Sequence, residues 1–120
     1  MIVAGFGFNA QARVDSLLEA MALAGPTPDG VATLVGKADG EIFARFADLL
    51  GRRAIFVAAV DAQAQSTLTK SDRSIAAHGV GSVAEACALA AAGPGAKLLG
   101  PRVISADRTA TCALAERSER

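Results

Sequence analysis

The sequence has few of the side chains that build common catalytic and metal sites. Its 120 residues include one His, two Cys, no Trp and no Tyr. Cys87 and Cys112 do not form a CxxC pair, so no metal site built from protein side chains is expected, and both thiols are expected to be buried in a reducing compartment. His78 has no obvious acidic residue to orient it, which argues against a serine-hydrolase triad.

The chain also lacks an excess of either charge and any long apolar run. Twelve basic residues balance twelve acidic ones, so bulk electrostatic attraction to nucleic acid or to a membrane surface is not expected. No segment offers 18 uninterrupted apolar residues, and the first expected strand begins at Ile2, which leaves no room for a signal peptide. We therefore expect a cytoplasmic protein without a nucleic-acid or membrane partner.

The hydrophobic pattern predicts an α/β fold. Short apolar runs predict strands at 2–7, 31–35, 54–60, 97–105 and 109–115. Helical spacing and stop signals predict helices from Val14 to Gly25 and from Ile42 to Gly51, and serine caps predict two more, at 71–78 and from Ser82 to Gly93. Residues 61–70 are polar and predict a loop that can include a helical turn. We expect a single three-layer α/β/α domain over 1–116, with a mostly parallel five-stranded mixed sheet, a final hairpin and a charged tail at 117–120.

Residues 79–89 combine a glycine-hinged loop with the start of a helix. Ser82 can cap that helix, and Glu85, three residues later, can bond back to the Ser82 amide to complete a capping box. Gly79 and Gly81 leave backbone N–H groups at a positive helix end, which suits an anionic ligand, and Ser71 precedes another helix in the same way. One exposed contact of this kind contributes only about 0.3–1 kcal/mol. A ligand with several carboxylates therefore fits better than one with a single negative charge.

The first strand leads into the sequence GFGFNA, which matches the GxGxxA pattern of dinucleotide-binding turns. The acidic residue that would bind an NAD ribose is replaced by Gly36-Lys37 after the second strand, although Lys37 is able to face the 2′-phosphate of NADP. Three interpretations stay open: NADP binding, glycines needed only for close packing, and a loop in which Gly5 and Gly7 line a site for another ligand.

Polar residues follow the second expected strand. Lys37, Asp39 and Glu41 fall beyond its carboxyl end, where open α/β sheets bind their ligands. Lys37 can pair with a substrate carboxylate, and Asp39 or Glu41 can act as a general base or bind a ligand by hydrogen bonds. The alternative is a solvated helix start, with Asp39 as the cap and Glu41 near the positive helix end.

The stretch from Gly79 to Leu89 resembles the signature GVxSVAEAxAL of a known family, which comprises CobE and the C-terminal domain of CbiG. The resemblance extends to the opening strand with its GxG, to Lys37 and Asp39, to Ser71 and to the strand 111–115, which resembles the family's TVAIA. The chain departs from the family pattern where Phe8 and Asn9 replace a Cys and a basic residue, where Gly40 precedes Glu41, where Thr69-Lys70 replaces Thr-Pro, and where Arg102 replaces a Lys.

This resemblance implies a role in cobalamin biosynthesis, at the stage of precorrin ring contraction. In CbiG the related domain is fused to another, and the whole protein is a lactone hydrolase that releases acetaldehyde. The resemblance to the stand-alone CobE form makes a corrinoid-binding protein our leading hypothesis, either a carrier or an accessory to another enzyme of the pathway.

Candidate residues follow from these hypotheses. The expected ligand-binding residues are Gly5, Gly7, Lys37, Ser71, Gly79, Gly81, Ser82 and Arg102. In the second hypothesis, hydrolysis of a precorrin lactone, the candidates that activate water are Asp39, Glu41 and Glu85. The third hypothesis is a small NADP-binding domain. No cofactor is expected in the first two.

Overall fold

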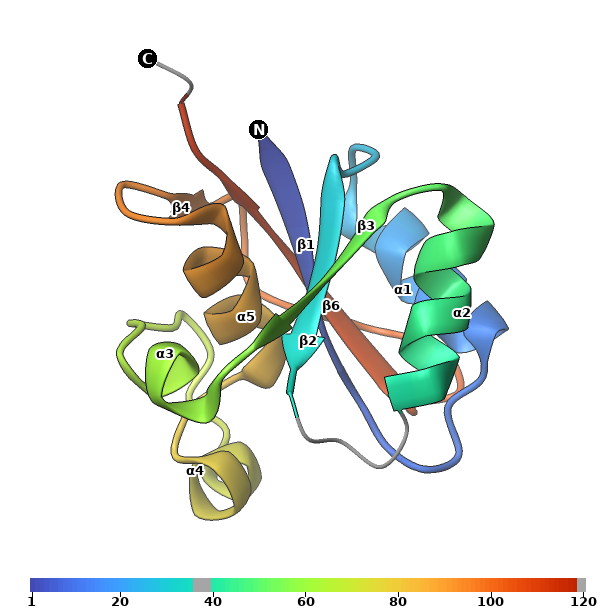
Figure 1. The fold of residues 1–120 in the computed structure, drawn as a ribbon. Helices are drawn as coiled ribbons and strands as arrows, with labels where there is room; N and C mark the ends of the chain where they lie inside the picture. Colours follow the sequence, from blue (N-terminus) through green and yellow to red (C-terminus); the bar gives the residue numbers. More distant parts are fainter. Residues whose placement is uncertain (36–39, 119–120) are drawn as a thin grey trace.

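The protein consists of a single mixed sheet with helices on both faces (Figure 1). The computed structural model describes residues 1–35 and 40–118. In chain order the elements are β1 (Ile2–Phe8), α1 (Val14–Ala24), β2 (Gly30–Leu34), α2 (Gly40–Leu50), β3 (Arg53–Val57), α3 (Ala59–Gln63), α4 (Asp72–His78), α5 (Val83–Ala92), β4 (Lys97–Leu98), β5 (Val103–Ile104) and β6 (Ala110–Glu116).

The strands lie in the order β3-β2-β1-β6-β4, and β5 also pairs with β6. β1, β2 and β3 are parallel, and β6 runs antiparallel to β1 from Ile2↔Glu116 to Phe8↔Ala110. The two central strands, β1 and β6, are buried almost throughout, because helices cover the two faces of the sheet. The parallel strands β1, β2 and β3 all end at the same edge of the sheet.

Each face of the sheet has its own hydrophobic core. On one face, α1 and α2 pack against the sheet around Phe6, Phe43 and Phe46, and the rings of Phe6 and Phe46 meet edge to face with centroids 5.0 Å apart. On the other face, α5 lies across β1, β2 and β6, with α3 beside it (Figure 1). Cys87 and Cys112 are both buried, as predicted.

The predicted α/β fold is confirmed, and two of its elements differ from expectation. The expected strand at 97–105 is split into β4 and β5, so the sheet has six strands instead of five, because Gly100-Pro101 interrupts the run and proline has no N–H for a ladder. The expected strand at 54–60 ends at Val57, and α3 begins at Ala59, within that expected strand, and runs into the polar segment for which a loop with a helical turn was predicted. The sequence Ala59–Gln63 contains good helix formers, and Asp61 in its first turn suits the positive helix end.

The predicted ends of α4 and the predicted final hairpin are confirmed. Ser71 caps α4, and Gly79 ends it in a left-handed conformation with a φ of 74°. In the β5–β6 turn, Arg108 has a φ of 63°, and the Ser105 amide donates to the Ala110 carbonyl over 2.9 Å.

In the described part of the chain, no single helix is long and apolar enough to cross a membrane. α4 and α5 together would have the length and apolar composition of a membrane span, but the two helices are bent by 61° relative to each other.

Candidate functional site

A cavity of about 340 Å³ opens beside the carboxyl end of β1. Its walls come from the end of β1 with the turn after it, from one side of α4, from the first residue of α5, and from the chain around the β5–β6 hairpin. The residues that line it are Gly7, Phe8, Asn9, Ser71, Arg73, Ser74, Ala77, His78, Val83, Arg102, Ile104, Arg108, Thr109, Ala110 and Thr111. Gly7, Ser71 and Arg102, all expected ligand-binding residues, are therefore brought together here.

The cavity is rich in positive charge. Arg73, Arg102 and Arg108 line it from three different segments, and none of the described residues in its lining is an Asp or Glu. Within residues 1–35 and 40–118, none of these three arginines forms an ion pair. A guanidinium presents several N–H donors in a planar fork that matches a carboxylate. The arrangement therefore suits a ligand that carries more than one carboxylate.

One polar atom in the α4 wall lacks a partner. The Ser71 hydroxyl accepts a hydrogen bond from the Ser74 amide over 3.3 Å, as expected for a helix cap. The hydroxyl oxygen of Ser74 is itself buried and has no hydrogen-bond partner among the described residues. Buried polar groups are nearly always paired, so this hydroxyl is an exception among the residues that line the cavity.

The start of α5 confirms half of the predicted capping box. The Ser82 hydroxyl accepts a hydrogen bond from the Glu85 amide over 3.2 Å, so Ser82 is the cap. The prediction that the Ser82 amide donates a hydrogen bond back to the Glu85 carboxylate was wrong. The carboxylate instead accepts from the amides of Leu68 (2.7 Å), Thr69 (2.9 Å) and Arg102 (2.8 Å) and from the Thr69 hydroxyl (2.5 Å). Four donors from two distant segments satisfy a buried carboxylate better than one local amide.

Glu85 is fully buried, and its charge is stabilised by these donors. Burial raises the pKa of the carboxyl, but the hydrogen bonds from the Thr69 hydroxyl and from the amides of Thr69, Arg102 and Leu68 outweigh burial, and the pKa is lowered. The carboxylate thus ties α5 to the 68–69 loop and to the backbone of Arg102. Through this last bond it fixes where the Arg102 side chain leaves the main chain.

The hairpin that carries Arg108 is held in a similar way. Asp107 accepts hydrogen bonds from the hydroxyls of Ser105 (2.6 Å), Ser16 (2.6 Å) and Thr109 (2.7 Å). These hydroxyls, that of Ser105 first, hold the pKa of the Asp107 carboxyl well below its usual range. The bond to Ser16 anchors the hairpin tip to α1, so the wall that carries Arg108 has a defined position.

The predicted glycines occupy different surroundings. A Cβ on Gly5 would overlap the main chain of α5 at Ala84 and Ala88, so this glycine allows the helix to pack closely on β1. A Cβ on Gly81 would overlap the Thr69 carbonyl oxygen and lie 2.7 Å from the Thr67 hydroxyl, so Gly81 lies directly under the 67–70 loop. Only Gly7 lines the cavity.

Of the acidic and basic residues expected after β2, Glu41 is the one that the structure describes, and it is not part of this wall. Glu41 lies exposed in the first turn of α2, with its carboxylate 4.0 Å from the Arg45 guanidinium. Lys37 and Asp39 lie outside the described residues. Among the residues that are described, no group of three or more His, Cys, Asp or Glu is placed to hold a metal ion.

Arg73, Ser74 and Arg108 were missed from the sequence. Ser71, Ser74 and His78 recur at helical spacing, which indicates one face of a short helix, but this spacing does not show what the face adjoins. Arg108 follows the turn residue Asp107, and an arginine at a hairpin tip is ordinarily solvated. The fold, and not the local sequence, places these side chains around one cavity.

Comparison with known proteins identifies relatives along the whole chain. A family model described as "Cobalamin synthesis G C-terminus" matches residues 2–115. The solved structure of CobE, a protein from the cobalamin (vitamin B12) biosynthetic pathway, is 30% identical with a TM-score of 0.84, over 96% of this chain and 92% of that one. The cobalamin biosynthesis protein chiG from Agrobacterium tumefaciens strain C58 is 34% identical with a TM-score of 0.77, over 99% and 100%. A search of curated proteins found no match. The resemblance predicted from the sequence is confirmed: the chain belongs to the cobalamin synthesis G C-terminus family and is a cobalamin biosynthesis protein.

Proposed function

We propose that the arginine-lined cavity binds the carboxylate side chains of a corrinoid intermediate, at the precorrin ring-contraction stage of cobalamin biosynthesis. The observation that carries this proposal is the convergence of Arg73, Arg102 and Arg108 on a cavity whose described lining residues include no acidic one. The unpartnered hydroxyl of Ser74 in the same wall adds a neutral donor for a ligand oxygen. Precorrins carry carboxylates around the whole ring, so several of these groups can be engaged at once.

The size of the cavity bears on the mode of binding. A volume of about 340 Å³ is at the low end for ligand pockets and is smaller than a tetrapyrrole with its side chains. The cavity is therefore proposed to receive one edge of the macrocycle and leave the remainder outside. A protein that holds an intermediate by one edge is suited to act as a carrier, or as an accessory to the pathway enzyme that acts on the exposed part.

The state of the two described acidic candidates, Glu85 and Glu41, favours binding over lactone hydrolysis. The oxygens of Glu85 already accept four hydrogen bonds, and a lowered pKa makes its carboxylate a weaker base. Glu41 lies exposed beside Arg45 and outside the cavity wall. NADP binding is disfavoured because α5 covers Gly5, the first glycine of the GxGxxA turn, and so blocks close approach of a pyrophosphate to it.

A titration with cobyrinic acid, a corrin with free carboxylate side chains, tests the binding role. We expect a saturable change in its visible spectrum, and we expect the triple variant R73A/R102A/R108A to bind roughly 10- to 100-fold more weakly. Each exposed ion pair contributes about 0.5–1 kcal/mol, and three such contacts add up to this range. This difference in affinity between the two proteins should shrink at high salt, because salt screens exposed charges.

Two controls make this titration specific. Lys97→Ala removes one positive charge from exposed β4, outside the cavity, and should leave the affinity unchanged. The methyl ester of the same corrin, in which the carboxylates are neutral, should bind far more weakly than the acid. Equal affinity of acid and ester, or of the triple variant and the unmodified protein, would contradict the proposal.

The same preparation distinguishes binding from catalysis. Lys37→Ala tests the remaining basic candidate, and weaker binding would add that residue to the site. Release of acetaldehyde from a lactone-bearing precorrin, measured in the presence of the other pathway enzymes, would favour the hydrolase alternative. Its absence, together with saturable corrin binding, would leave the binding role as the function.

A further inference from the structure

β3 forms one end of the sheet, and one side of its backbone faces outwards. The carbonyl of Val57 accepts a hydrogen bond from the Val35 amide over 2.8 Å, so the main-chain groups of Val57 point towards the β2 side. Since these groups alternate along a strand, those of Ala54 and Phe56 point away from β2. No described strand pairs with β3 on that outer side. Ala54 and Phe56 therefore present two N–H and two C=O groups to a further strand.

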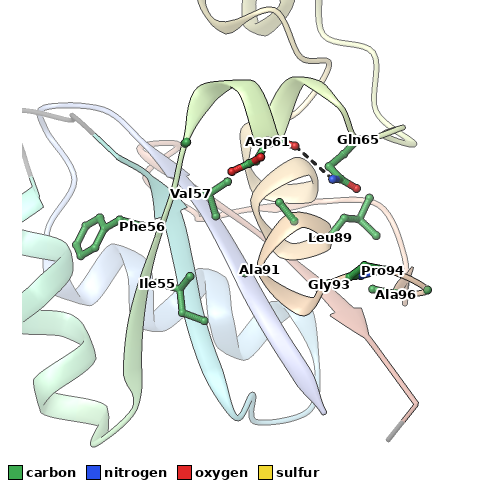
Figure 2. Close-up of a pocket in the computed structure, with 13 residues that line it drawn as sticks. Ile55, Phe56, Val57, Asp61, Gln65, Leu89, Ala91, Gly93, Pro94 and Ala96 are labelled. Atoms are coloured by element: carbon green, nitrogen blue, oxygen red, sulfur yellow. Dashed lines mark hydrogen bonds between the residues drawn. The ribbon is translucent and has the colours of Figure 1, made fainter. Parts of the chain in front are cut away.

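A second cavity, of about 510 Å³, lies alongside this edge (Figure 2). Its walls are β3, the start of α3, the second half of α5 and the 93–96 loop. Figure 2 shows Ile55 and Val57 directed into the cavity beside Leu89, whereas Phe56 lies on the opposite side of β3. Among the described residues that line it, Asp61 is the one that carries a charge. Most of these lining residues are of apolar types, with a single negative charge near the end of the strand.

We propose that this edge joins two copies of the chain, with β3 pairing antiparallel to β3 of the second copy. Because only Ala54 and Phe56 point outwards, the symmetric register places Ala54 opposite the partner's Phe56 and Ile55 opposite the partner's Ile55. This register forms four backbone hydrogen bonds and makes the two sheets continuous. It also covers Phe56, which is 44% exposed in the single chain.

Charge complementarity selects a second copy as the occupant. Side chains alternate along a strand, so Arg53 projects to the same face as Ile55 and Val57, the face on which the cavity lies. In the proposed register the partner's Arg53 lies opposite Val57, close to Asp61 in the cavity wall. The same contact occurs twice by symmetry. Arg53 is exposed in the single chain, and no described carboxylate forms an ion pair with it.

Sedimentation velocity over a concentration series tests this interface. The unmodified chain is expected to form a dimer that dissociates on dilution. Ala54→Pro removes an N–H that points away from β2, so it should keep the fold and abolish the dimer, since proline is accepted on the outer side of an edge strand. Circular dichroism checks the fold of this variant. The cobyrinic acid titration should be unaffected, because the two cavities share no lining residue.

A charge exchange provides a test that does not depend on the proline variant. R53E and D61R should each weaken the dimer about 5- to 30-fold, because each variant places like charges together twice per dimer. The double variant R53E/D61R should restore dimerisation, since the paired charges are opposite again. A monomer at all concentrations would overturn the proposal. A dimer that persists in A54P, or in both single charge variants, would also overturn it, because its interface must then lie elsewhere.

Discussion

Replacing Gly5 by alanine is expected to destabilise the protein by about 3 kcal/mol or more, and the valine variant should not fold. A Cβ at this position would overlap the carbonyl oxygen of Ala84 and the amide nitrogen of Ala88. These are main-chain atoms of α5, so they cannot move aside as the end of a side chain can. The helix must lift from β1, which opens the core on that face of the sheet. Urea unfolding followed by circular dichroism measures the loss.

Gly100→Ala is the matched control for this change. A Cβ on Gly100 meets no atom within 4 Å, and the backbone there does not adopt a positive φ. This variant should stay within about 0.5 kcal/mol of the unmodified protein. If G5A were as stable as G100A, the close approach of α5 to β1 described above would be wrong.

Glu85→Gln is expected to cost about 2–3 kcal/mol of folding free energy, with little change in side-chain volume. A glutamine keeps one oxygen for the amides of Leu68 and Thr69. Its NH₂ group then faces the Arg102 amide, so two donors meet and the buried Arg102 N–H loses its partner. Denaturant unfolding measures the cost. Glu41→Gln is the control, because Glu41 is exposed and its contact with Arg45 contributes only about 0.3–0.5 kcal/mol.

The pH dependence of stability gives a second measurement on Glu85. Its pKa in the folded protein lies below the ordinary value of 4.5, so the folded state holds the ionised form more favourably than the unfolded state does. The stabilisation is therefore complete above pH 4.5 and is lost as the pH falls through the folded-state pKa. E85Q should show a shallower loss of stability below pH 4.5. Asp107 has the same direction of shift and is present in both proteins, so the difference between the two curves reports Glu85.

Loss of the hydrogen bond between Glu85 and the Arg102 amide should also affect the arginine-lined cavity. In E85Q the backbone at Arg102 loses its anchor while the arginine side chain remains, so corrin binding should weaken under conditions where the variant is still folded. Parallel stability curves for E85Q and the unmodified protein would mean that the pKa of Glu85 is the same in the folded and unfolded states, contrary to the stabilisation that its hydrogen bonds give to the ionised form.

Much of the fold follows from local signals in the sequence. The ends of α4 and α5 were predicted correctly from two serines and two glycines, Ser71, Gly79, Ser82 and Gly93. Serine caps and glycines with a positive φ act within a few residues of the helix end, so the local sequence reveals them. The split of the 97–105 strand shows the limit of the apolar pattern, since the pattern continues through a proline that the hydrogen-bond ladder does not accept. The sequence indicated only a helical turn within 61–70 and not a helix that begins at Ala59, because a five-residue helix has too little periodicity to place.

The site was predictable only where a residue's own neighbours determine its place. Gly7, Ser71 and Arg102 were expected near a ligand and do line the cavity. The partners of Glu85 were not predictable, because they come from the 68–69 loop and from Arg102, which reach the carboxylate only through the tertiary fold. The same holds for Arg73 and Arg108, which share a cavity although 35 positions separate their numbers in the chain.

The place of β6 in the sheet has a consequence for how the chain is made. β6 pairs with β1, β4 and β5, so three strands of the sheet depend on the strand of that sheet that comes latest in chain order. While the polypeptide is still growing, β1 has only β2 on one side, and its other edge is open until residues 110–116 emerge. The central ladder joins residues more than a hundred positions apart, and contacts of this kind form slowly. During translation the exposed edge of β1 therefore offers a pairing site to other unfinished chains, and the speed at which the last strand arrives governs how long that hazard persists.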